Sequence, residues 1–174
     1  DRITKNLNPI AAEYRTGNGA IMGLLYDSIS RRYDGKIHPW MASTIDWTAT
    51  GESLSATVNL RDNLRWHDGT QLTTDDVAFT YKFLQDTSLD AEGLTVPAPL
   101  YRGRTALVES TDIIDEKTVR IDFGATARPV AKRALTTPVL PAHIWREKSE
   151  RADILGIDIS GTVTKALVWA NQNP

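Results

Sequence analysis

The stretch of residues 54–84 constrains the fold of this chain more than any other part of the sequence. It opens with the segment 54–60, in which every second residue is apolar, and this period of two predicts a strand with one buried face. A compact polar turn follows over residues 61–70, where Gly69 suits a positive φ and Trp66 is large enough to anchor the turn on a sheet. A catalytic use of this Trp-His-Asp segment is the alternative, but a scaffold turn accounts for every residue in it.

A helix is predicted directly after this turn. Thr73 can cap the backbone N–H of Asp76, and the carboxylates of Asp75 and Asp76 lie against the positive end of the helix dipole. Val77, Tyr81 and Leu84 follow at the i, i+4, i+7 spacing of one buried helical face, and Phe79 and Phe83 widen that apolar face. Two adjacent carboxylates could also form an acid–base pair, but neighbouring helical positions point about 100° apart. Capping is therefore the favoured role for both side chains.

Composition places the chain among ordinary globular proteins. Its 174 residues, 41% hydrophobic and 24% charged, suffice for one domain with a core, or for a domain plus part of another. The formal net charge of −2 provides no basic field for nucleic acid or for a membrane surface, and no apolar run is long enough to span a bilayer. The absence of cysteine excludes disulfides, thiol catalysis and zinc–thiolate sites. The sequence has no signal peptide at Asp1. This absence carries no information, because we expect the sequence to be a piece cut from a longer protein.

The flanking segments predict further elements. Before the central stretch, residues 20–29 have helical spacing with Asn18 as cap, residues 33–36 form a turn, and residues 47–52 end a strand and enter a hairpin.

After the central stretch, residues 86–103 predict a long loop, because they have no period and contain glycine and proline. Residues 106–108 and 118–123 then predict an antiparallel hairpin, and residues 130–135 a helix that begins near Pro129.

Motifs for catalysis and for metal binding are missing from the sequence. The three histidines, His38, His67 and His143, do not stand at ligand spacing, so we expect no metal site. No serine lies in a Gly-x-Ser-x-Gly elbow, and the Gly-x-Gly at Gly17 lacks the third glycine of a phosphate-binding loop. We therefore predict a protein that is not an enzyme and has no cofactor.

Binding has a better candidate in Glu13, Tyr14 and Arg15. Within three residues these offer a carboxylate for an amine, a guanidinium for a carboxylate and a ring for an apolar side chain, as a peptide or small zwitterion requires. An ordinary solvated loop is an equally good interpretation of the same residues.

Several motifs resemble a known family. The signature segments are Leu60-Arg61-Asp62, Trp66-His67-Asp68-Gly69-Thr70 and Leu72-Thr73-Thr74-Asp75-Asp76-Val77. Shorter matches are Asn8-Pro9, Leu25 to Ile29, Asp34 to Ile37, Pro39 to Ala42 and the segment from Pro141 to Trp145. Together these resemble the family 5 extracellular solute-binding proteins, the peptide- and nickel-type receptors of ABC importers.

This resemblance implies a fold and a division of the chain. We expect an α/β (mixed α+β) structure of the type II periplasmic-binding-protein class, represented by part of the first lobe. Residues 1–25 would be the N-terminal segment of that lobe, residues 26–138 an inserted subdomain, and residues 139–174 the return into the lobe. The second lobe would lie outside the chain.

The resemblance also implies a function. We expect an extracytoplasmic receptor, lipid-anchored in its full-length form, that captures a peptide or small solute and delivers it to the permease subunits of an ABC transporter. Membrane contact would occur only through an anchor outside this chain, and no nucleic acid would be bound. In the family, the segment after Asn8-Pro9 lines the ligand cleft, which supports Glu13, Tyr14 and Arg15, and the region of Tyr101 and Arg102 often adds a second aromatic or cationic contact.

Alternatives remain open at this point. The ligand could be a metal chelate of the nickel type or a sugar, and the chain could be a structural or interaction domain without a cleft. A hydrolase that reuses the fold is a more distant alternative.

Overall fold

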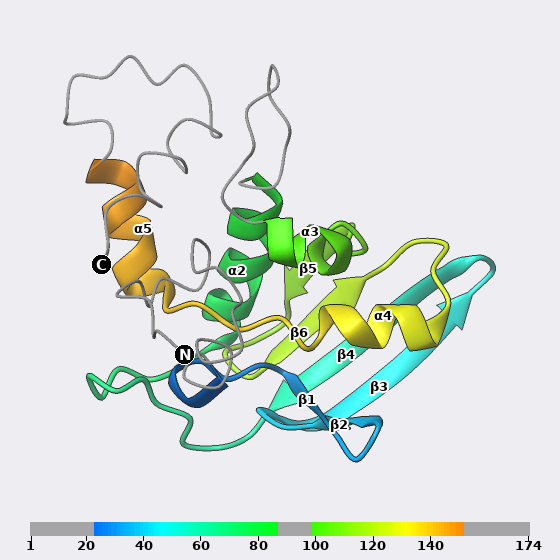
Figure 1. Cartoon of the computed structure of the whole chain (residues 1–174), viewed down its shortest axis with the longest axis horizontal. Coiled ribbons are helices and arrows are strands. Elements are labelled where there is room, and N and C mark those ends of the chain that lie inside the picture. The colour runs from blue at the N-terminus through cyan, green and yellow to red at the C-terminus, as the bar shows by residue number, and fades with distance from the viewer. Residues whose placement is uncertain (1–22, 87–98, 152–174) are drawn as a thin grey trace, which may run out of the picture.

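The computed structural model describes residues 23–86 and 99–151 (Figure 1). Its elements in chain order are β1 (Ser30–Tyr33), β2 (Lys36–Pro39), β3 (Ala42–Thr50), β4 (Ser53–Leu60), α2 (Thr74–Asp86), α3 (Pro99–Thr105), β5 (Ser110–Ile113), β6 (Thr118–Asp122), α4 (Arg128–Ala134) and α5 (Ala142–Arg151). Residues 23–25 are also helical. None of the helices in this part of the chain is long and apolar enough to cross a membrane.

An antiparallel sheet of four strands, in the order β3-β4-β6-β5, is the centre of the fold. The alternation predicted for β4 is confirmed, because Ala56 and Val58 are fully buried while Thr57 between them is only half-buried. β6 extends the buried face, since Ile121 pairs with Ala56 and Val119 with Val58. The smaller hairpin of β1 and β2 precedes this sheet, and its turn lies at the predicted position.

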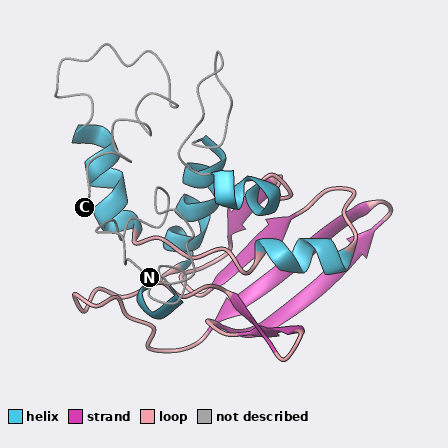
Figure 2. Cartoon of the chain, viewed as in Figure 1, coloured by secondary structure: helices cyan, strands magenta, loops and turns pink. Residues whose placement is uncertain are grey.

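Helices α2 and α4 cover the buried face of the sheet, and Figure 2 shows α4 lying across it. Val77 and Tyr81 of α2 and Ala131 and Ala134 of α4 share one apolar core with the strands. The Tyr81 hydroxyl donates to the Ala134 carbonyl oxygen at 3.1 Å. Burial raises the pKa of Tyr81 above its ordinary value, so the hydroxyl stays protonated and joins the two helices.

A second apolar cluster joins α2, α3 and α5 at the other end of the molecule. Its buried members are Leu84, Tyr101, Leu140 and Trp145. The Trp145 ring meets Phe83 edge-on, with centroids 5.8 Å apart. The predicted apolar face of α2 therefore serves two clusters, one on the sheet and one under α3 and α5.

Two predicted elements differ from the structure before the sheet and after α2. The helix predicted over residues 20–29 ends by Leu25, because the backbone beyond it pairs with a distant segment: Val139 N–H donates to Asp27 O at 2.8 Å and Ser30 N–H to Leu135 O at 2.9 Å. The long loop predicted over residues 86–103 is wrong for residues 99–103, which belong to α3. Residues 87–98 lie outside the described part of the chain.

The predicted hairpin exists, but its first strand is β5 rather than residues 106–108. The prediction was wrong because Val108 is buried in the core from a loop, so its apolar run resembles a strand although the strand begins at Ser110. In the exposed strand β5, by contrast, hydrogen bonds to β6 hold a mostly polar segment in place. The predicted helix after Pro129 is confirmed as α4.

Candidate functional site

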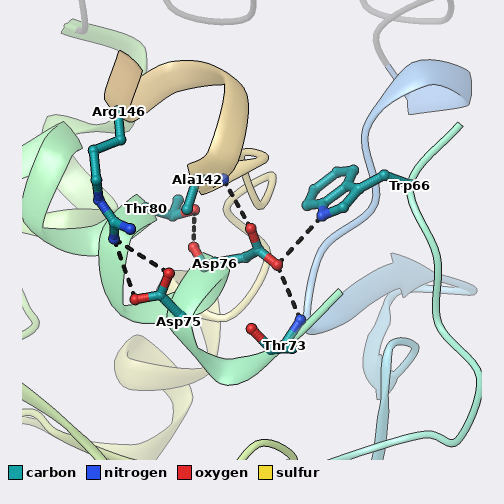
Figure 3. Close-up of polar contacts among 7 residues, drawn as sticks. All are labelled: Trp66, Thr73, Asp75, Asp76, Thr80, Ala142 and Arg146. Atoms are coloured by element: carbon teal, nitrogen blue, oxygen red, sulfur yellow. Dashed lines mark hydrogen bonds and ion pairs between the residues drawn. The ribbon is translucent and has the colours of Figure 1, made fainter. Parts of the chain in front are cut away.

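The adjacent carboxylates at the start of α2 have separate structural roles (Figure 3). Asp76 is 4% exposed. Its carboxylate accepts hydrogen bonds from the Thr73 backbone N–H at 2.9 Å, the Ala142 backbone N–H at 2.8 Å and the Trp66 indole Nε1–H at 3.3 Å. These donors come from the polar turn and from the first turns of α2 and α5, so Asp76 joins three segments at two helix N-termini.

Asp75 points away from Asp76, toward Arg146 of α5 (Figure 3). The Arg146 Nη2 lies 3.2 Å from both Asp75 carboxylate oxygens in a half-exposed ion pair. The predicted divergence of the two carboxylates is thus confirmed, and they do not share a substrate position.

The predicted cap at Thr73 is realised in the opposite direction. The Asp76 side chain accepts from the Thr73 backbone, and the Asp76 N–H donates to the Thr73 carbonyl oxygen at 3.2 Å. This is the return half of a capping box, with aspartate in the place of the usual glutamate.

The polar turn is fastened to α5 by a second contact. His143 Nε2 lies 2.7 Å from Asp68 Oδ2, and the Thr70 backbone N–H donates to Asp68 Oδ1 at 2.8 Å. The His143 hydrogen bond, aided by the Thr70 N–H, lowers the pKa of Asp68 to about 2. Gly69 adopts the predicted positive φ, at 89°. The Trp-His-Asp-Gly segment is therefore a scaffold turn, as its sequence indicated.

The described residues contain one hollow with a different character, which we call the arginine pocket. It has a volume of about 310 Å³ and lies between β1, β2 and the ends of α3 and α4. The lining side chains important for its chemistry are Tyr26, Arg31, Arg32, Arg104, Arg133 and Thr136. This volume is at the lower end of the range for small-molecule sites.

Two of the four arginines are held in place by the protein. Arg31 donates to the Gly23 carbonyl oxygen at 2.7 Å, pairs with the Asp27 carboxylate and lies over the Trp40 ring. Arg104 Nη1 donates to the Thr136 carbonyl oxygen at 3.1 Å. Within residues 23–86 and 99–151, neither Arg104, Arg32 nor Arg133 forms an ion pair with a carboxylate.

Tyr26 adds a neutral hydrogen-bonding group to the arginine pocket. Burial raises the pKa of the Tyr26 phenol above its ordinary value, so it remains protonated at neutral pH. The arrangement offers cationic and hydroxyl donors, and the described residues that line it include no nucleophile paired with a base. It suits binding rather than bond making.

The predicted contact residues stand in different relations to this pocket. Glu13, Tyr14 and Arg15 lie outside the described residues. Tyr101 is 2% exposed within the second apolar cluster, and Arg102 follows it on α3, the helix that supplies Arg104 to the pocket. No finding tests these contacts, so they stay predictions.

Sequence reasoning missed Arg31, Arg32 and Arg133 as candidate residues. The adjacent pair Arg31-Arg32 was a usable signal, but only the fold shows that α4 brings Arg133 to the same hollow. The three histidines do not gather either, and the described residues contain no group of three or more His, Cys, Asp or Glu side chains able to hold a metal.

Comparison with known families identifies the family of this chain. The sequence model of the bacterial extracellular solute-binding proteins, family 5, middle region, matches residues 36–162. This match covers most of the chain, and the chain therefore belongs to that family. Because the family consists of solute-binding proteins, the prediction that the chain is not an enzyme is also confirmed.

Individual relatives agree with this assignment. The peptidoglycan-binding protein YepA of Agrobacterium fabrum is 28% identical over 137 residues, which are 75% of this chain and 20% of that protein. The substrate-binding protein CtaP of Listeria monocytogenes is 28% identical, with a TM-score of 0.63 over 82% of this chain. An oligopeptide-binding protein of Thermotoga maritima is 26% identical, with a TM-score of 0.62 over 88% of the chain.

A further solved structure shows the same fold at lower identity. NikZ of Campylobacter jejuni, in complex with Ni(L-His), is 21% identical, with a TM-score of 0.64 over 84% of this chain. The predicted mixed α/β fold of the type II periplasmic-binding-protein class is therefore confirmed. The chain spans only 27% of the length of each of these three structures.

Proposed function

We propose that this chain is part of the first lobe of an extracytoplasmic receptor that captures peptides or a related small solute for an ABC importer. The observation that carries the proposal is the family match over residues 36–162. The names of two relatives, which refer to peptidoglycan and oligopeptide binding, support a peptide-like ligand. A metal chelate or a sugar is the alternative ligand.

The proposed mechanism is capture by closure. Two lobes joined by a hinge would close on the solute and present it to the permease, and no covalent bond is made or broken. The arginine pocket supports this role, because it is a hollow with oriented donors between strands and helices of the same packed unit.

We also propose the division of the chain into residues 1–25, 26–138 and 139–174. The backbone supports these boundaries, because the two ends of the middle unit meet. Ser28 and Pro138 form an isolated antiparallel bridge, and Val139 N–H donates to Asp27 O at 2.8 Å. A unit whose entry and exit segments pair in this way is suited to insertion into another lobe.

Five residues remain proposed ligand contacts: Glu13, Tyr14, Arg15, Tyr101 and Arg102. We further propose that the full-length receptor lies outside the cytoplasm, in the periplasm or at the cell surface, and is held there by a lipid anchor. Fractionation of cells into cytoplasmic, membrane and soluble extracytoplasmic fractions tests this location, and recovery of the receptor in the cytoplasmic fraction would contradict it.

Calorimetric titration of the intact gene product with a mixture of short peptides tests the function. We expect saturable heat from the intact protein and none from the 174-residue chain run in parallel, because the second lobe supplies half of the enclosure. Absence of heat with the intact protein would contradict peptide capture. Saturable heat from nickel chelates or oligosaccharides would then identify the alternative ligand.

A further inference from the structure

We propose that the arginine pocket is an oxyanion subsite, which selects solutes that carry two or more carboxylate or phosphate groups. This inference rests on the proposed receptor function and specifies the ligand class. Peptides rich in Asp or Glu are the carboxylate form of such a solute.

The first argument is the local charge. Four arginines line the pocket, and no aspartate or glutamate is among the described residues that line it. Arg31 is offset by Asp27, whereas Arg32, Arg104 and Arg133 form no ion pair in the described part of the chain. This concentration of positive charge occurs in a chain whose formal net charge is −2, so it does not reflect a generally basic surface.

The second argument is the origin of the arginines. Arg31 and Arg32 are neighbours on β1, Arg104 is the last residue but one of α3, and Arg133 lies in the last turn of α4. A solvated charged face normally arises from one element, whereas here three elements converge on one hollow of about 310 Å³. Like charges brought together in this way repel one another, and an anionic ligand would remove that cost.

The third argument is preorganisation. The Thr136 carbonyl oxygen fixes one amino group of Arg104, which leaves the rest of the guanidinium for a ligand. The Gly23 carbonyl and the Trp40 ring likewise fix Arg31. Guanidinium groups match carboxylate and phosphate oxygens with two parallel hydrogen bonds, and ordering them beforehand lowers the entropy cost of binding.

Matched peptides test the inference on the intact gene product. Ala-Glu-Glu and Ala-Gln-Gln have the same length and nearly the same shape, but only the first carries side-chain carboxylates. We expect Ala-Glu-Glu to bind about ten-fold more tightly or better in calorimetric titration, and this advantage to shrink as salt is raised. Inorganic pyrophosphate serves as the phosphate source.

Two variants test the role of the arginines: R32Q/R133Q removes two lining arginines, and K132Q is the control. The double variant should lose about ten-fold or more of the affinity for Ala-Glu-Glu and clearly less of the affinity for Ala-Gln-Gln, which offers only its terminal carboxylate. Lys132 lies beside Arg133 in the last turn of α4 but does not line the pocket, so K132Q removes a charge from the same helix end without touching the site. K132Q should bind both peptides as the wild type does.

The outcomes separate this inference from the receptor function. Equal affinity for the two peptides, or equal loss in both variants, would overturn the oxyanion subsite while leaving peptide capture intact. Binding of pyrophosphate but of neither peptide, abolished in R32Q/R133Q, would support the subsite with phosphate as the source and overturn peptide capture. Binding of no probe at all would overturn both.

Discussion

Two charged clusters of this molecule use charge in opposite ways. At the junction of the polar turn, α2 and α5, each of Asp68, Asp75 and Asp76 has donors from another segment. In the arginine pocket, only Arg31 of the four arginines has a carboxylate partner among the described residues. Satisfied charges hold segments together, whereas convergent charges without partners are available to a ligand. The comparison therefore separates the part that maintains the fold from the part that binds.

The largest expected effect comes from breaking the satisfied cluster at Asp76. D76N keeps the shape of the side chain but removes its charge and replaces one acceptor oxygen with an NH2 group, which cannot accept a hydrogen bond from a backbone N–H. We therefore expect a loss of about 2–4 kcal/mol in the free energy of unfolding. D75N removes only a half-exposed ion pair, and it should cost at most about 1 kcal/mol. Urea unfolding of both variants measures the difference, and equal losses would show that Asp76 is not the joining residue.

A smaller loss is expected from Thr80, which extends the same junction. Its hydroxyl donates to the Asp76 carbonyl oxygen at 2.6 Å and accepts from the buried Leu140 N–H at 2.8 Å. T80V keeps the volume but leaves the Leu140 N–H without this partner, so the free energy of unfolding should fall by about 1–3 kcal/mol.

Thr48, an exposed residue of β3, provides the matched control for this substitution. T48V should leave the free energy of unfolding within about 0.5 kcal/mol of the wild type. A T80V variant as stable as T48V would contradict the account of the junction.

The smallest effect concerns the exposed contact between Asp68 and His143. The pKa of Asp68 lies at about 2, below the ordinary value of 3.8, so its contribution to stability is fully present above pH 4 and is lost as the pH falls through about 2. H143A removes the largest cause of this shift.

Urea midpoints measured from pH 5 to pH 2 follow this contribution. The wild type should exceed H143A above pH 4, and the gap should narrow toward pH 2. A gap that stays constant over this range would contradict a role for the Asp68 charge.

The sequence predicted the satisfied cluster better than the arginine pocket, and there is a physical reason. The strand, turn and helix of residues 54–84 are specified by local signals: alternation in β4, a glycine at positive φ, and acidic residues in the first turn of α2. Such signals act between neighbours in the chain. They therefore do not depend on tertiary contacts and can be identified without a structure.

The pocket and the missed elements depend on contacts between distant residues. Arg32 and Arg133 are about a hundred positions apart in the sequence, and only the packing of α4 on the sheet brings them to one hollow. In the same way, backbone pairing of residues 27 and 28 with residues 138 and 139 ends a helix that local spacing extended to residue 29. The periodicity of one segment carries no information on such pairings.

The assignment of a structural role to the aspartate cluster and of a binding role to the arginine pocket is tested most directly by the free energy of unfolding that a ligand adds. With Ala-Glu-Glu at 100 times its dissociation constant, the free energy of unfolding of the intact wild-type protein should rise by about 2.7 kcal/mol. Without ligand, R32Q/R133Q should be at least as stable as the wild type, because two of the mutually repelling charges are removed. At the same ligand concentration it should gain at most about 1.4 kcal/mol. A full gain in R32Q/R133Q, or a lower stability of that variant without ligand, would contradict the assignment of binding to the arginine pocket.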